Sequence, residues 1–269
     1  MSSPTGPTPP PPPMYPVASS PIVPEPTGPG LSEPQRLVNT FIAPSKTFTD
    51  IRRNASWWVP WLISGIFALA FGIVAVQKID IPRFVQQQID KSPSAQARLE
   101  RATPAQREQG LAIQATITKV SFYMLPVFTL IGGLLIAAVL MAIFNFIMGA
   151  EVSYSRALAV TFYAFFPGIL KSILLCVSLL AASDPNSIDI ASNPMPTNPA
   201  FFMDPLGNKF LYTFLSYVDI FAIWYVVLMG MGFALASSNR KVSVSSGIST
   251  VFAAYGIWAL GAACLKLIF

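Results

Sequence analysis

Lys171 and Asp219 are the two charged residues that lie deep inside long apolar segments of this 269-residue chain. Charges at membrane depth are rare and costly, so these side chains are the first candidates for chemistry. At about 1.5 Å per helical residue, Lys171 lies roughly 16 Å and Asp219 roughly 14 Å from the same end of their expected spans. The matched depths, on spans that follow one another in antiparallel order, predict an ion pair between Lys171 and Asp219.

Such a pair is compatible with two roles. It is either a proton or cation relay site, or a structural clamp between two helices. An isolated charge at this depth costs about 2.5–3.5 kcal/mol, and pairing is the simplest way to lower that cost. The sequence therefore favours the clamp and leaves the relay as the alternative.

The chain has few residues that could carry out other kinds of chemistry. It contains no histidine, which excludes histidine acid–base catalysis, Ser-His-Asp triads and histidine metal sites. Its two cysteines, Cys176 and Cys264, lie in separate apolar segments and form no metal-binding motif. A single deep carboxylate cannot form an aspartyl dyad. We therefore predict no catalytic residue, no metal, no cofactor and no enzymatic activity.

The composition is that of an integral membrane protein. Hydrophobic residues make up 53% of the chain and charged residues only 11%, against about 25% in a soluble domain. The net charge of +5 is small and scattered, which argues against nucleic acid as a partner. Five apolar segments reach the length of about 20 residues that a span needs. They are Trp57–Val76, Ser121–Met148, Ala157–Ala182, Phe210–Ala236 and Gly247–Phe269. The expected fold class is therefore an all-α polytopic membrane protein with five transmembrane helices.

The N-terminal region differs from the rest. Residues 1–35 hold 13 of the 25 prolines and few apolar groups, which predicts a disordered tail. Two short amphipathic helices follow, which we expect to lie at the membrane interface. The first has Leu37, Val38, Phe41 and Ile42 on one face, with Arg36 and Asn39 off it. The second spans Lys46–Asn54, and Ser45 is expected to cap it. Residues 36–269 then form the membrane domain.

Charge places the N-terminus in the cytoplasm and, with five spans, the C-terminus outside. Arg240 and Lys241 stand unopposed in a very short connection, whereas the long proline-rich loop carries Asp184, Asp189 and Asp204 against Lys209. Basic residues favour the cytoplasmic side of short loops. The charge totals on the two sides are otherwise nearly equal, so the orientation depends on these loops.

Three segments in this order resemble the Yip family, the Ypt/Rab-interacting proteins that share the Yip-one domain, in its bacterial branch. The first runs from Phe41 to Phe48 and includes Pro44; the second is Tyr163 to Pro167; the third is Asp219 to Trp224. The resemblance covers roughly residues 35–269. It implies five helices, a cytoplasmic N-terminus and no known catalytic centre. Eukaryotic members act in vesicle trafficking, where they bind small GTPases and one another, but no GTPase-binding motif can be matched here.

The resulting hypothesis is a non-enzymatic membrane scaffold or interaction protein, in membrane organisation or trafficking. Its expected environment is the bacterial cytoplasmic membrane, and its expected partners are the bilayer, other membrane proteins or further copies of itself. The alternative is a small transporter or channel that uses the Lys171–Asp219 pair. A flux that disappears in Asp219→Asn would favour that alternative.

Overall fold

The computed structural model describes residues 28–204, 207–239 and 242–268, and within them the secondary structure is helical, with no β-strand. The expected disordered tail falls mainly on residues 1–27, outside the described residues, as do Arg240 and Lys241. Within the described residues, the first helix begins at Glu33.

The first two helices start at other residues than expected. α1 (Glu33–Ile42) begins four residues before Leu37, because Ser32 and Gln35 form a capping box and Pro34 occupies the first turn. The boundary expected after residue 35 therefore falls inside α1. α2 (Pro44–Asp50) follows a single residue, Ala43, which is its N-cap without a side-chain hydrogen bond. The predicted cap at Ser45 is wrong, since Pro44 already occupies the first turn.

The five expected crossings correspond to four continuous or nearly continuous spans and one bent pair. α3 (Trp58–Lys78) and α7 (Leu125–Met148) are unbroken, whereas α8 (Tyr154–Phe165) and α9 (Gly168–Ala181) are separated at Pro167. α10 (Lys209–Tyr217) and α11 (Ile220–Ala236) meet at an angle of 52°, and α12 (Val244–Ile268) completes the set. The all-α polytopic membrane architecture is thus confirmed, with four spans, or five where the bent pair counts as the fourth crossing, and hydropathy did not reveal the break in that pair.

The long connection after α3 is largely helical. It forms α4 (Ile81–Asp90), α5 (Pro93–Arg101) and α6 (Pro104–Tyr123), and α6 leads into α7 through a turn at Met124. α6 packs along α3, because Gly72 leaves room for the backbone carbonyl of Phe122. The second long connection contains two short 3-10 helices, η1 (Pro185–Ser187) and η2 (Pro199–Phe202).

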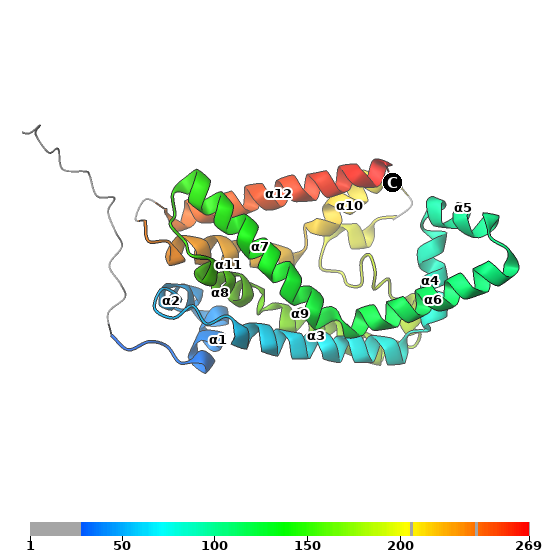
Figure 1. The fold of residues 1–269 in the computed structure, drawn as a ribbon, viewed down its shortest axis with the longest axis horizontal. Helices are drawn as coiled ribbons and strands as arrows, with labels where there is room; N and C mark the ends of the chain where they lie inside the picture. The colour runs from blue at the N-terminus through cyan, green and yellow to red at the C-terminus, as the bar shows by residue number, and fades with distance from the viewer. Residues whose placement is uncertain (1–27, 205–206, 240–241, 269) are drawn as a thin grey trace, which may run out of the picture.

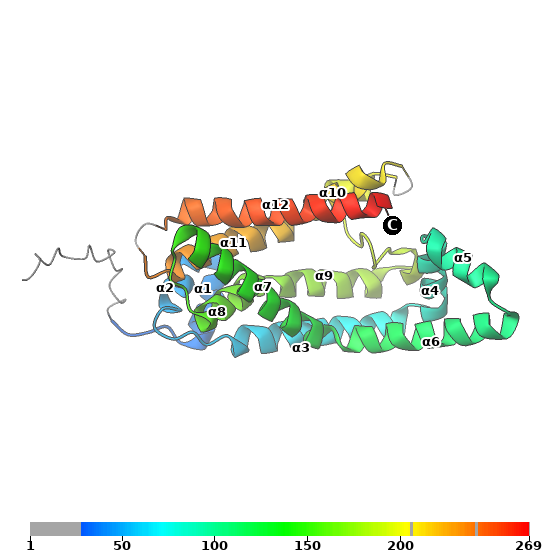
Figure 2. The same ribbon diagram turned by 45° about the horizontal axis from the view of Figure 1, so that its top comes forward.

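The connections gather at two opposite ends of the bundle (Figures 1 and 2). At the α1–α2 end, the Ser237 hydroxyl donates to the Ala150 carbonyl at 2.6 Å, and Arg156 donates to the Arg52 carbonyl at 3.1 Å. At the α4–α5 end, Lys91 pairs with Asp189 at 2.9 Å. The two short connections and the N-terminal helices therefore share one end, and the two long connections share the other, as alternating crossings require.

The orientation of these two ends gives a testable expectation. With the N-terminus in the cytoplasm, a cysteine at exposed Ser192 of the α4–α5 end should react with an impermeant thiol reagent in intact cells. A cysteine at exposed Ser155 of the α1–α2 end should react only after the membrane is opened. The two native cysteines, Cys176 and Cys264, are replaced by serine beforehand. The reverse labelling pattern would contradict the cytoplasmic N-terminus.

Close packing of α11 against α12 depends on glycine. A Cβ on Gly230 would lie 2.4 Å from Cα of Ile248, so Gly230→Ala must push the two helices apart. We expect it to lower the free energy of unfolding in detergent by about 1–3 kcal/mol. Gly132→Ala is the matched control, because its Cβ would meet no atom within 4 Å. That change should be neutral or stabilising by up to about 1 kcal/mol. Equal melting of both variants would contradict the tight α11–α12 contact.

Candidate functional site

Asp219 occupies the break between α10 and α11. It is the N-cap of α11, and its Oδ1 accepts hydrogen bonds from the backbone N–H groups of Phe221 at 2.9 Å and Ala222 at 3.3 Å. The residue is only 5% exposed. An aspartate that caps a helix satisfies donors that the first turn leaves without partners, so Asp219 itself starts the second half of this crossing.

Two further groups bind the other oxygen of Asp219. Nζ of Lys171, from α9, lies 3.4 Å from Oδ2 and 5.8 Å from the ring centroid of Phe221. The hydroxyl of Thr197, from the second long connection, donates to the same oxygen. The carbonyl of Thr197 also accepts from the Ile220 N–H at 3.0 Å. The structure thus brings together the two residues singled out in the sequence. It adds Thr197, whose contact with Asp219 could not be predicted because the two residues are far apart in the sequence.

The Asp219 cluster, defined as Asp219, Lys171 and Thr197, lies near the middle of the membrane-spanning part. Trp57, the N-cap of α3, stacks on Phe162 of α8 with ring centroids 5.4 Å apart. Lys171 is nine residues beyond Phe162, about 14 Å along the helix axis, and ten residues from the end of α9 at Ala181, about 15 Å. This position agrees with the depth estimated from the sequence.

The arrangement of the Asp219 cluster suits a structural clamp. Both carboxylate oxygens accept hydrogen bonds, and the four donors come from α9, α11 and the loop before α10. Each oxygen of the Asp219 carboxylate accepts from two donors, so the carboxylate links these segments. An oxygen with two donors already bound is poorly suited to accept a transported proton or cation. Among the described residues, no group of three or more cysteine, aspartate or glutamate side chains could hold a metal ion.

A second polar network, at the α1–α2 end, was missed in the sequence. Arg36 is only 2% exposed, and its guanidinium contacts Oδ2 of Asp50 through Nε at 2.8 Å and Nη2 at 2.7 Å. Nη1 donates to the Asn54 carbonyl at 2.9 Å and lies 3.6 Å from Glu33. The Tyr163 hydroxyl of α8 donates to Glu33 at 2.6 Å. We call Arg36, Asp50, Glu33 and Tyr163 the Arg36 network.

α1 is amphipathic as predicted, but both of its faces contact the bundle or its surroundings in ways that the sequence did not indicate. Arg36, expected off the apolar face, is buried, whereas Val38 is 56% and Ile42 75% exposed. Arg36 can be buried because Asp50, Glu33 and the Asn54 carbonyl satisfy its guanidinium. The only local signals were Glu33, three residues before Arg36, and the capping pair Ser32 and Gln35.

The three family-like segments meet at Phe41. Phe41 contacts the rings of Phe166 and Trp224, with centroids 5.6 Å and 6.0 Å apart. Phe48 is fully buried in the core between α2, α8 and α11, and a Cβ on Gly232 would lie 2.9 Å from its ring. The remaining members have local roles: Pro44 opens α2, Pro167 precedes α9, and Tyr163 and Asp219 belong to the two polar networks.

Comparison with known proteins gives one family and no individual relative. A search of the curated proteins and of the solved structures finds no match. The Yip1 domain matches residues 38–267, which include α1 from its sixth residue, all five crossings and both long connections. Because this match covers most of the chain, the protein belongs to the Yip1 domain family.

Proposed function

We propose that this protein is a non-enzymatic scaffold that holds its N-terminal helices against the membrane bundle and presents them to other membrane proteins or to a second copy. The Yip1 family is not a known enzyme family. Several helices of this chain are apolar and long enough to cross a membrane. We place it in the bacterial cytoplasmic membrane, with the α1–α2 end in the cytoplasm and the C-terminus outside.

The Arg36 network is the observation that supports this proposal. It joins α1 to Asp50 of α2 and, through Glu33, to Tyr163 of α8, so the position of α1 is defined by charge as well as by apolar packing. On the outer side of the same helix, Val38 and Ile42 remain exposed. The Arg36 network thus holds one side of α1, and the other side exposes apolar side chains. An exposed apolar surface of this kind is a suitable contact for a partner at the membrane edge.

The Asp219 cluster supports the scaffold over a transporter. A transport site must bind and release its ion, whereas Asp219 is buried and partnered on both oxygens. Its hydrogen bonds tie the break in the fourth crossing to α9. We therefore assign Lys171 and Asp219 to the stability of the bundle.

Photocrosslinking in intact membranes tests the scaffold. A photoreactive amino acid at Val38 or Ile42 should give protein–protein adducts of defined mass. The same amino acid at Leu135 of α7, which is 63% exposed, should give lipid adducts only. Lipid adducts alone from all three positions, together with an ion flux in proteoliposomes that Asp219→Asn abolishes, would establish the transporter instead.

A further inference from the structure

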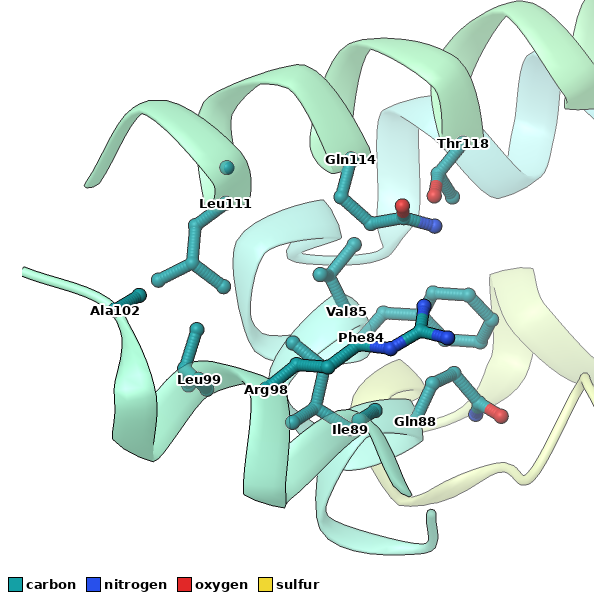
Figure 3. A pocket seen from close by; sticks show the side chains of 12 residues that line it. Phe84, Val85, Gln88, Ile89, Arg98, Leu99, Ala102, Leu111, Gln114 and Thr118 are labelled. Carbon is teal, nitrogen blue, oxygen red and sulfur yellow. The ribbon is translucent and has the colours of Figure 1, made fainter. Parts of the chain in front are cut away.

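A cavity of about 440 Å³ lies between α4, α5 and α6, outside both polar networks. Figure 3 shows Arg98 reaching from α5 into this space, with Gln114 and Thr118 directed from α6 toward the same region. Leu99 and Leu111 face each other at the other side of the cavity (Figure 3). We call this space the α4–α6 pocket. It combines one cationic group with an apolar wall.

Arg98 has no carboxylate partner among the residues that the structure describes. The neighbouring basic residues Arg83 and Lys91 pair with Asp184 and Asp189. Arg107 donates to two backbone carbonyls. The Arg98 guanidinium thus keeps its planar set of donors for a ligand, and that set matches the geometry of a carboxylate.

The α4–α6 pocket begins at the edge of the membrane-spanning part. Phe122 of α6 lies beside Gly72 of α3, so distances along both helices can be measured from this contact. Thr118 is about 6 Å beyond Phe122, and α3 ends at Lys78, about 9 Å beyond Gly72. Gly110, at the far side of the pocket, lies about 18 Å from Phe122. The pocket therefore extends from the end of the apolar span through a layer comparable to the lipid headgroups.

We propose that the α4–α6 pocket binds the anion of a single-chain fatty acid, with its carboxylate on Arg98. The acyl chain packs on Val85, Ile89, Leu99 and Leu111, and the side chains of Gln88 and Thr118 add hydrogen-bonding groups near the carboxylate. The single cation and the volume, toward the lower end of the roughly 300–1,000 Å³ of small-molecule sites, favour one chain over a two-chain phospholipid. Exposed Ile117 and Val120 on the adjacent face of α6 connect the pocket to the bilayer, from which a fatty acid can enter.

The full-length protein in nanodiscs of zwitterionic lipid tests this site, with photoreactive palmitate as the probe and mass spectrometry to locate the adducts. We expect palmitate to label peptides of α4–α6. Arg98→Gln should reduce this labelling at least about tenfold, because it removes one charge-assisted contact with the carboxylate. Arg101→Gln, on the same helix but outside the lining, should label like the wild type. A photoreactive long-chain alcohol should label the pocket at least about tenfold less than palmitate does.

Gly110 provides a test that does not change charge. A Cβ at this position would meet no atom within 4 Å, so Gly110→Phe places a ring in the open pocket while α6 is kept. It should abolish the labelling, and Gly110→Ala should not. A second cavity of about 440 Å³, between α7, α11 and α12, has no charged lining residue and serves as the internal reference. Equal labelling of the α4–α6 pocket by acid, alcohol and photoreactive phospholipid, or labelling unchanged in Arg98→Gln or Gly110→Phe, would overturn the proposal.

Discussion

Arg36→Met is expected to lower the free energy of unfolding by about 3–5 kcal/mol, because it leaves a buried carboxylate without its main partner. Asp50 would lose the contacts at 2.7 and 2.8 Å that its Oδ2 makes with the guanidinium. Oδ2 would keep the Leu31 N–H at 3.2 Å, and Arg53 lies 3.9 Å from Oδ1. Chemical unfolding in detergent measures the change.

Asp50→Asn should cost less than Arg36→Met. After this change, the Arg36 guanidinium still has the Asn54 carbonyl at 2.9 Å and Glu33 at 3.6 Å, so its charge remains partly compensated. The double variant Arg36→Met/Asp50→Asn should recover part of the combined loss, because neither charge is then left buried alone. A double-mutant cycle separates this coupling from the cost of each truncation.

Lys46→Met is the control for the Arg36 network. Lys46 is an exposed residue of α2, so removing its charge should change stability by no more than about 0.5 kcal/mol. Arg36→Met should also expose the segment between α2 and α3 to limited proteolysis, since α1 and α2 would no longer be held on α8. If Arg36→Met and Lys46→Met unfold at the same denaturant concentration, the network does not hold these helices.

The sequence predicted the elements whose signal is local and strong. Five apolar segments reach spanning length, and four correspond to candidate spans and the fifth to a bent helix pair, because hydropathy follows directly from the solvent that a span must face. The Lys171–Asp219 contact was predictable for a related reason: a charge at that depth needs a partner, and few candidates exist.

Features set by contacts between distant segments could not be predicted. The burial of Arg36 depends on Asp50 and Tyr163, and no local sequence pattern predicts that these residues lie around it. Residues 210–236 form one apolar run, so hydropathy could not show the bend between α10 and α11. Asp219 was the available signal, since an aspartate followed by an apolar run is a common helix start. Thr197 had no signal, because its contact with Asp219 spans a loop.

Asp219→Ala is expected to be the most damaging change at mid-depth, with a loss of about 3–5 kcal/mol from the broken pair and a further cost of about 0.5–2 kcal/mol from the lost helix cap. Asp219→Asn should be milder, since its side-chain oxygen can still accept from the Phe221 N–H. The difference between the two variants therefore reports the cap, and the loss that remains in Asp219→Asn reports the ion pair.

Lys171→Met should cost about 1–3 kcal/mol, less than Asp219→Ala, because Asp219 keeps the Thr197 hydroxyl and two backbone donors. Lys171→Met and Asp219→Asn together should cost less than the sum of the two single changes, by at least about 1 kcal/mol. Strictly additive losses in the unfolding cycle would show that the contact contributes nothing. A favourable coupling, with unchanged ion permeability of proteoliposomes in every variant, would assign the pair to the packing of α9 on α11.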